Sequence, residues 1–187
     1  MVWGEAEDSA EAADVPGAGE LRAVGRLKEN AMSFMHRRKL LKAIDTEKIK
    51  DAIREAEQKT SGEIRVSIAP FFYGKVRPVA EKAFLRLRMT NTRQRNGILF
   101  FIVPARRRFV VLGDEGIHVK VGQKFWEQIV TAMSEKFRKG EFTEGIIKGI
   151  KEVGEHLAAH FPYDPLTDVN ELPDDVDFDR KKKKQDN

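Results

Sequence analysis

The sequence predicts an α/β domain with helices on both faces of a small mixed sheet. Three observations support this prediction. Residues 63–69 alternate between polar and apolar side chains, as a strand with two different faces does. Residues 98–103 are apolar without interruption, which is typical of a strand covered on both faces. Around these two strands, apolar residues recur at the spacing of amphipathic helices.

The first helix is predicted to begin at Asp45, whose carboxylate can accept hydrogen bonds from the free N–H groups of the first turn. Ile44 and Ile49 stand at the two positions of a hydrophobic staple around this start. The helix then carries one apolar stripe, formed by Ile49, Ala52, Ile53 and Ala56. Ser61 and Gly62 end it, so the strand at residues 63–69 follows directly.

A second helix, with Pro78 in its first turn, leads from this strand to the apolar strand at residues 98–103. The order strand, helix, strand permits a right-handed parallel crossover. A short polar turn at residues 104–107 follows, so residues 108–112 are expected to return antiparallel as a hairpin. The sheet is therefore expected to be mixed, with residues 98–103 as its central strand and an acidic loop after residue 112.

Two further helices complete the predicted domain. An apolar stripe runs from Phe125 to Phe137 and stops at Gly140, and Thr143 is predicted to cap the last helix. Gly145 and Gly149 are expected to let this last helix approach the sheet closely. A dimer face is the alternative for these glycines, although the force of that motif is known from membrane helices.

One domain with two tails accounts for the length of 187 residues. Residues 1–30, rich in Ala, Gly and Glu, are predicted to be a disordered arm, and residues 31–162 the folded domain. Residues 163–187 are predicted to be a charged, mostly disordered tail. Its apolar residues Leu166, Leu172 and Val176 leave open that part of it lies along the domain.

The composition excludes several classes of protein. The absence of cysteine excludes disulfides, thiolate metal sites and cysteine nucleophiles, and it fits a reducing compartment. The acidic N-terminal stretch lacks the basic start of a signal peptide. The longest apolar run, residues 98–103, is far below the roughly 18 residues that cross a bilayer. We therefore expect a cytoplasmic protein, free or peripheral to a membrane, without a transmembrane segment.

The net charge of +4 hides a separation of charge, because acidic residues concentrate at the two ends and basic residues in the body of the chain. A basic face of this kind could bind an anionic membrane or nucleic acid. The simpler interpretation is a solvated surface countered by the acidic tails. No aromatic residues are interleaved for base stacking, which argues against nucleic acid.

One group of polar residues is a candidate site. If the hairpin forms, Asp114 returns to the end of the sheet where the preceding strand begins, and residues near that end supply oxygen ligands of the kind that Ca²⁺ or Mg²⁺ prefers. The candidate metal ligands are Asp114, Glu115, Asn96, Glu63 and Asn91. The alternative is ordinary turn chemistry, because Asn96-Gly97 and Gly113-Asp114 are common loop-forming pairs.

Motifs for other chemistry are absent from the sequence. It contains no GxxxxGK[ST] loop, no GxGxxG after a strand and no GxSxG elbow, so nucleotide-binding and hydrolase hypotheses of these types lack support. No catalytic residue or cofactor-binding residue can be assigned from a motif.

Several short segments resemble the TPM domain family, which includes thylakoid-lumen, photosystem-repair and MOLO-type proteins. The matching segments are Thr-Ser-Gly-Glu-Ile-Arg-Val at 60–66, Arg-Asn-Gly-Ile-Leu at 95–99 and Leu-Gly-Asp-Glu-Gly-Ile-His at 112–118. Residues 137–140 and 144–146 match its later helices. Residues 160–162 and 170–173 resemble a bacterial subgroup that lacks the export signal and is often associated with LemA-type membrane proteins.

The resemblance implies a three-layer α/β/α sandwich around a small mixed sheet. It also implies two functions: binding of divalent cations, especially Ca²⁺, and acid phosphatase activity, which is ascribed to plant members. The acidic residue that commonly precedes Asn-Gly in the family is replaced by Arg95 here, which removes one potential metal ligand.

These observations give three functional hypotheses. The leading one is a non-enzymatic binding module that binds Ca²⁺ weakly at the end formed by Asn96, Asp114 and Glu115 and docks a protein partner, which could be membrane-associated. The second is a metal-assisted acid phosphatase in which Arg93 or Arg95 contacts the phosphate. The third is binding of an anionic membrane or nucleic acid through the basic face.

Overall fold

The computed structural model describes residues 41–70, 74–106, 108–166 and 168–179. The predicted N-terminal arm lies outside the described residues. The helices are α2 (Thr46–Glu57), α3 (Val76–Arg86), α4 (Glu115–Arg138) and α5 (Phe142–His160), with a 3-10 turn η1 at Pro104–Arg106. The strands are β1 (Glu63–Ile68), β2 (Gly97–Val103), β3 (Arg108–Gly113) and β4 (Val176–Phe178).

The strands form one mixed sheet in the order β3-β2-β1-β4. β1 lies parallel to β2 and to β4, whereas β2 and β3 form an antiparallel hairpin. The expected central position of residues 98–103 is confirmed, because β2 has a neighbour on each side. The fourth strand comes from the segment that was predicted to be a tail.

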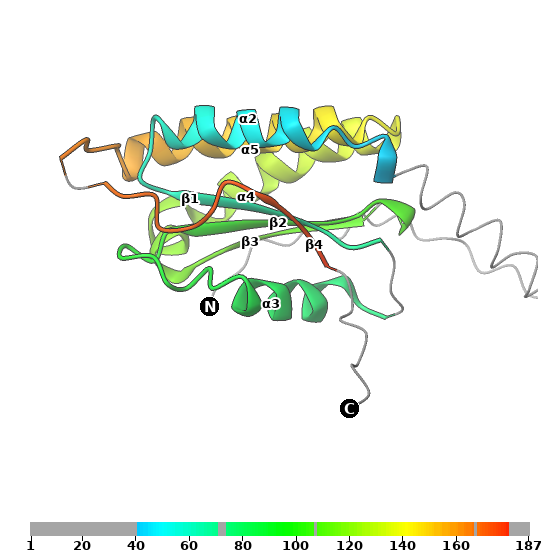
Figure 1. The fold of residues 1–187 in the computed structure, drawn as a ribbon, viewed down its shortest axis with the longest axis horizontal. Coiled ribbons are helices and arrows are strands. Elements are labelled where there is room, and N and C mark those ends of the chain that lie inside the picture. Colours follow the sequence, from blue (N-terminus) through cyan, green and yellow to red (C-terminus); the bar gives the residue numbers. More distant parts are fainter. Residues whose placement is uncertain (1–40, 71–73, 107, 167, 180–187) are drawn as a thin grey trace, which may run out of the picture.

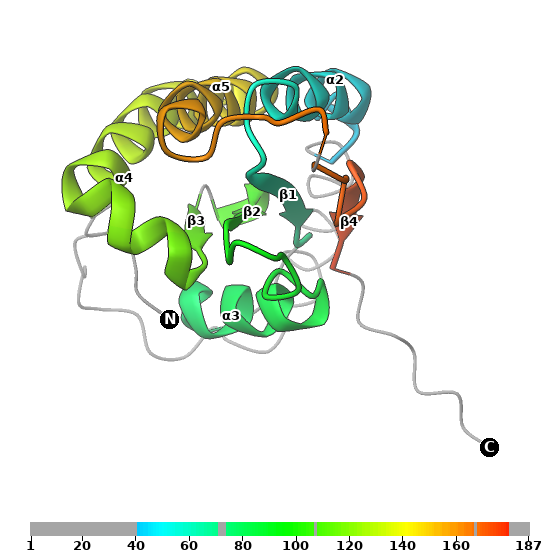
Figure 2. The same ribbon diagram turned by 90° about the vertical axis from the view of Figure 1, so that its left-hand side faces the viewer.

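Helices cover both faces of this sheet, which confirms the predicted three-layer sandwich. Figure 1 shows α2, α5 and α4 above the sheet and α3 below it, and Figure 2 shows the same layers from the side. On the α2, α4 and α5 side, Ile64, Val66 and Phe100 belong to a large buried cluster. On the α3 side, Leu99 and Phe101 pack in a second cluster. The uninterrupted apolar sequence of β2 follows from this double coverage.

The predicted start of the first helix is confirmed. The Asp45 carboxylate accepts a hydrogen bond from the backbone N–H of Lys48, at 3.2 Å, and so caps α2. Ile44 and Ile49, the two residues of the predicted staple, are both buried in the same cluster.

Two predictions about later helices need correction. The acidic loop expected after β3 is instead the start of α4, since Asp114 is the N-cap residue of that helix. α4 changes direction at Gly122, whose φ of 69° and ψ of 179° are not helical, and only the part after this glycine carries the predicted stripe. Thr143 does not cap α5, which begins one residue earlier, at Phe142. Its hydroxyl instead accepts a hydrogen bond from the backbone N–H of Asp45, at 3.0 Å.

The two glycines of α5 allow close packing, as predicted, but against α4 as well as the sheet. A Cβ atom on Gly145 would lie 2.6 Å from Cδ1 of Phe137, in α4. A Cβ atom on Gly149 would lie 2.7 Å from Sδ of Met133, in α4, and 2.9 Å from Cε1 of Phe100, in β2.

The segment after α5 runs back along the molecule to reach β1. We call residues 168–179 the strap. Leu172 and Val176 in the strap are buried, whereas Leu166, before it, is 92% exposed. The alternative left open for the tail, that part of it lies along the domain, therefore holds for the strap, because two apolar anchors and β4 fix it there. Residues 180–187 lie outside the described residues. None of the helices in the described part of the chain has the length and apolar content needed to cross a bilayer.

Candidate functional site

Three of the predicted site residues meet at one end of the sheet. The hairpin sets Gly113 opposite Ile98, and the backbone N–H of Asp114 donates to the carbonyl of Gly97, at 2.9 Å. β1 begins at the same end, where the N–H of Glu63 donates to the carbonyl of Asn96, at 3.3 Å. The backbones of Asp114, Asn96 and Glu63 therefore lie at one end of the sheet, but each side chain has its own protein partner.

Asp114 is fully buried and its carboxylate is engaged on both oxygens. The guanidinium of Arg95 donates from Nε to Oδ2, at 2.5 Å, and from Nη2 to Oδ1, at 2.9 Å. Oδ1 also accepts the backbone N–H of Glu115, at 2.8 Å, which caps α4. The hydrogen bonds with Asp114 raise the pKa of Arg95. Asp114 thus joins the loop before β2 to the start of α4.

The other predicted ligands at this end are divided between surface and interior. Glu115 and Asn91 are exposed, and so are the side chains of Arg93 and Arg95. Asn96 is buried, and its Nδ2 donates to the carbonyl of Ser61, at 2.7 Å, while its Oδ1 has no hydrogen-bond partner in the described part of the protein. Asn96 therefore fixes the loop that leads into β1.

Glu63 links the start of β1 to the strap. Its side chain is 5% exposed, and its carboxylate accepts the backbone N–H groups of Glu171, at 2.9 Å, and Leu172, at 3.1 Å. Burial raises the pKa of Glu63 to about 7, against the lowering effect of these two N–H groups, and the nearby charges of Glu171 and Asp174 add to the rise.

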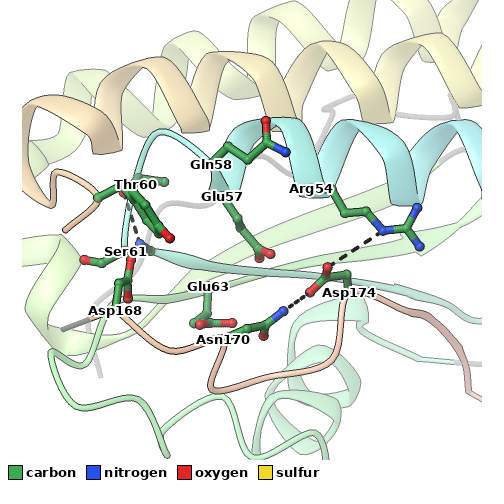
Figure 3. Close-up of a pocket in the computed structure, with 11 residues that line it drawn as sticks. Arg54, Glu57, Gln58, Thr60, Ser61, Glu63, Asp168, Asn170 and Asp174 are labelled. Carbon is green, nitrogen blue, oxygen red and sulfur yellow. Dashed lines mark hydrogen bonds and ion pairs between the residues drawn. The ribbon is translucent and has the colours of Figure 1, made fainter. Parts of the chain in front are cut away.

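Glu63 also borders a cavity of about 340 Å³ between the end of α2, the start of β1 and the strap. Figure 3 shows its side chains converging from these three elements. We call it the acidic cavity, because four carboxyl side chains but only one basic side chain, Arg54, line it. The lining residues are Arg54, Glu57, Gln58, Thr60, Ser61, Gly62, Glu63, Tyr163, Asp168, Asn170 and Asp174.

Glu57, the last residue of α2, has the most strongly shifted pKa of the residues that line this cavity. Burial raises its pKa to about 9, and the carboxyls of Glu63 and Asp174 contribute, although the N–H of Ile64 opposes the shift by donating to Oε1 at 2.8 Å. The pKa of Asp168 is also raised, first by burial and then by Glu171 and Asp164.

Sequence reasoning missed Glu57, Asp168 and Asp174. One signal was available for Glu57, which lies four residues after the buried Ile53 and so extends the apolar face of α2. Nothing in the local sequence signalled Asp168 and Asp174, because their place depends on the path of the strap across the domain.

The carboxyl groups surround the acidic cavity without converging on one point. Within residues 41–70, 74–106, 108–166 and 168–179, no three acidic, histidine or thiol groups are close enough to hold one metal ion directly. A cation in this cavity would therefore need carbonyl, amide or water oxygens as additional ligands.

The fold and this site define a small α/β/α domain with an acidic cavity beside one end of its sheet. The sequence model of the TPM domain matches residues 35–156, which is well over half of the chain. The chain belongs to the TPM domain family, as the resemblance of its motifs indicated. The family match ends before the strap begins.

A solved relative supports the same assignment. The BA42 protein from the psychrophilic bacterium Bizionia argentinensis, determined by NMR, is 36% identical in sequence and superposes with a TM-score of 0.68. The alignment covers 72% of this chain and 94% of BA42. No curated protein matches the chain.

Proposed function

We propose that this TPM domain is a divalent-cation-binding module, with Ca²⁺ as the ion, and that the ion occupies the acidic cavity. The observation that carries the proposal is the pair Glu57 and Glu63, a half-buried and a buried carboxyl that face the same cavity and hold protons well above the ordinary pKa of a glutamate. Carboxyls whose pKa is raised by burial and by neighbouring carboxyls are stabilised in their charged form when a cation replaces the proton.

The composition of the cavity supports an ion of this kind. Asp168 and Asp174 contribute further carboxyl groups, and Asn170, Thr60 and Ser61 contribute neutral oxygens. Oxygen ligands and irregular geometry suit Ca²⁺ better than Mg²⁺, which demands a near-ideal octahedron. Because the carboxyls do not converge on one point, we expect a weak site, with a Kd on the order of 10⁻⁴ to 10⁻³ M.

The proposal moves the metal site away from Asp114. Both oxygens of Asp114 accept hydrogen bonds from Arg95, so a cation there would have to displace a guanidinium from a buried carboxylate. Glu63 is the residue of the predicted ligand set that the proposal retains, and Asn96 acts indirectly by fixing Ser61 at the rim of the cavity.

The phosphatase hypothesis has no comparable observation in its favour. The guanidinium of Arg95 is already bound to Asp114, and that of Arg93 lies 3.8 Å from the carboxylate of Glu171. Binding through the basic face, a cytoplasmic or membrane-peripheral location and a membrane-associated partner stay predictions.

Isothermal titration calorimetry with Ca²⁺ tests the proposal. We expect saturable binding to the wild-type chain, and at least a tenfold loss of affinity in Glu63→Gln. Glu55→Gln is the matched control, because Glu55 is an exposed residue of α2 outside the cavity. Equal Ca²⁺ affinity in Glu63→Gln and Glu55→Gln would overturn the assignment to this cavity.

A further inference from the structure

The edge of β1 that faces β4 is only half paired. β4 pairs with Val66, Ser67 and Ile68, the second half of the strand. In the first half, the N–H of Ile64 points toward the same edge as the N–H of Val66, because alternate residues of a strand point the same way. This N–H donates to the side chain of Glu57 and not to a neighbouring strand. The start of β1 therefore has an edge with no strand paired to it beside the acidic cavity, where Ile64 is fully buried and its N–H is held by Glu57.

The strap leaves this edge unpaired because its backbone turns. Continuing the register of β4 by two residues would set Asp174 opposite Ile64. However, the N–H of Asp175 donates to the carbonyl of Pro173, at 2.8 Å, and this tight turn takes the chain out of the ladder. Pro173 also has no N–H to donate to β1.

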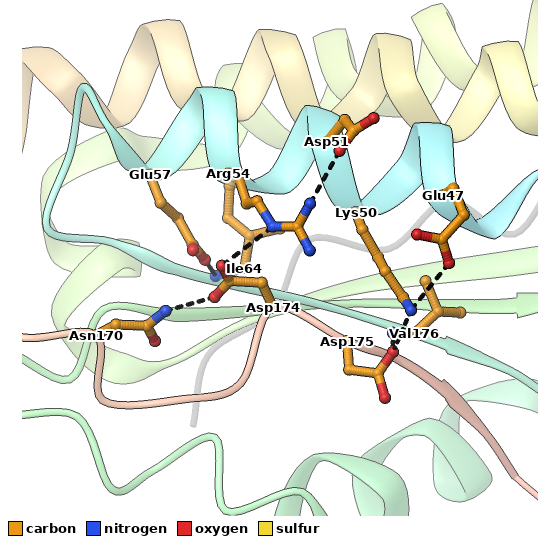
Figure 4. Close-up of polar contacts among 10 residues, drawn as sticks. All are labelled: Glu47, Lys50, Asp51, Arg54, Glu57, Ile64, Asn170, Asp174, Asp175 and Val176. Atoms are coloured by element: carbon orange, nitrogen blue, oxygen red, sulfur yellow. Dashed lines mark hydrogen bonds and ion pairs between the residues drawn. The ribbon is translucent and has the colours of Figure 1, made fainter.

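Charged side chains frame the edge and bind the strap. Below the sheet, Arg86 of α3 donates two hydrogen bonds to the carboxylate of Asp177, at 2.9 and 2.6 Å, and Ser67 donates a third, at 2.7 Å. Above it, Lys50 of α2 lies 3.1 Å from Asp175. Figure 4 shows Lys50 and Arg54 reaching from α2 to the strap.

The carboxylate of Asp174 stands among other carboxyl groups, because Glu57 and Glu63 line the same cavity. It accepts a hydrogen bond from Nδ2 of Asn170, at 2.5 Å, and Nε of Arg54 lies 3.9 Å away. A basic side chain at this position would pair with Glu57. The strap therefore places a carboxylate beside the basic Arg86 at the position next to Ser67, but a carboxylate beside other carboxyls at the position next to Ile64.

We propose that this edge of β1 is the docking site for an extended segment of a partner protein, which runs parallel to β1 and carries a basic residue at the place of Asp174 and an acidic residue at the place of Asp177. The strap is the resident occupant of the second half of the site. A partner segment without the Pro173 turn pairs along the whole of β1 and fills the acidic cavity, so it gains contacts that the strap lacks.

The strap of a second copy is a weaker candidate for this site. It makes only the contacts that the chain's own strap already makes, and the covalent connection gives the resident strap the higher effective concentration. The inference does not rest on the proposed cation site, because strand pairing and the Arg86 contact carry it. The test is therefore run without added divalent cation.

The test uses the full chain and fluorescently labelled peptides in an anisotropy titration. The first peptide has the strap sequence, residues 168–179, and the second carries Pro173→Val and Asp174→Lys in that sequence. To free the site, the protein carries Asp177→Lys, which places a positive charge against Arg86 and removes the acceptor of the Ser67 hydroxyl. Asp175→Lys, at an exposed carboxylate opposite Lys50, is a second strap variant in case the first does not fold.

We expect the second peptide to bind the strap variants about tenfold more tightly than the first, and both peptides to bind them more tightly than the wild-type chain. Adding Arg86→Glu to the Asp175→Lys variant, whose own strap keeps Asp177, should abolish binding of both peptides, and a peptide with Asp177→Lys should restore it. No binding to either strap variant, or equal binding of the two peptides, would overturn the proposal. A wild-type dimer that dissociates in Asp177→Lys would assign the site to a second copy instead.

Discussion

Arg95 and Asp114 join two parts of the chain through a buried carboxylate. Arg95 lies in the loop before β2, with a φ of 52°, and Asp114 is the N-cap residue of α4. The two hydrogen bonds of the guanidinium, at 2.5 and 2.9 Å, occupy both carboxylate oxygens. This pair explains how the end of β3 and the start of β2 are held together, and it assigns Asp114 a structural role.

Asp114→Ala should destabilise the protein by about 2–4 kcal/mol, because it removes the cap of α4 and leaves Arg95 without its partner. Arg93→Ala should cost less than about 0.5 kcal/mol, because the Arg93 side chain is 68% exposed and its guanidinium lies 3.8 Å from the carboxylate of Glu171. Urea denaturation measures both values. An Asp114→Ala variant as stable as Arg93→Ala would show that the ion pair contributes nothing.

The acidic cavity should make stability fall as pH rises. The pKa values of Glu57 and Glu63, about 9 and about 7, are higher in the folded protein than the ordinary glutamate value of 4.5, so the folded state binds more protons than the unfolded state between these values. Below pH 4.5 both groups are protonated in the folded and in the unfolded state, so they do not reduce the stability there. Stability decreases as the pH rises from about 4.5 through 7, where both groups contribute, and further toward 9, where Glu57 alone does, by several kcal/mol in total.

Thermal unfolding at a series of pH values, without Ca²⁺, measures this dependence. Glu57→Gln keeps an oxygen that can accept the N–H of Ile64 but cannot ionise, so its unfolding temperature should fall by only roughly a quarter of the wild-type decrease between pH 6 and pH 9. Parallel curves for the wild type and Glu57→Gln would show that Glu57 ionises normally.

Binding of Ca²⁺ should show the opposite dependence on pH. The ion requires charged carboxylates, and the raised pKa values of Glu57 and Glu63 mean that protons compete with it near neutral pH. We expect Ca²⁺ affinity to increase by about tenfold or more from pH 6 to pH 8.5, with protons released on binding. Calorimetry in buffers of different ionisation enthalpy detects this release, and an affinity that is constant over this pH range would argue against the cavity.

Leu172 should determine how firmly the strap is attached. Its side chain is 6% exposed and packs in the cluster between the sheet and α3. Leu172→Ala should weaken the strap by roughly 2 kcal/mol, so that the amide of Asp179, which donates to the carbonyl of Ile68, exchanges with solvent on the order of thirtyfold faster. Leu166→Ala is the control, since that side chain is 92% exposed, and it should leave the exchange rate unchanged. Equal exchange rates of the Asp179 amide in the two variants would show that Leu172 does not hold the strap on the domain.

The sequence predicted those features of the fold that depend on local periodicity. β1, β2 and β3 follow from alternating or uninterrupted apolar residues, and the start of α2 follows from Asp45, Ile44 and Ile49. The position of Asp114, Asn96 and Glu63 at one end of the sheet was predictable, because a parallel crossover followed by a hairpin leaves few possible arrangements of the three strands.

The roles of individual side chains at that end depend on tertiary partners and were not predictable. A Gly-Asp pair after a strand suits either a loop or a helix N-cap, and the part of α4 before Gly122 has too little apolar periodicity to reveal a helix. The acidic cavity forms only when the strap crosses the start of β1. Its carboxyls Asp168 and Asp174 are separated in sequence from Glu57 and Glu63, so no local pattern joins them.

The most direct test of the central claim is an amide-resolved NMR titration of the full chain with Ca²⁺. We predict saturable shifts at residues that line the acidic cavity, such as Gly62, Glu63 and Asn170, and their loss in Glu63→Gln. The absence of saturable shifts at the cavity, or shifts confined to Asn91, Asp114 and Glu115, would contradict the account.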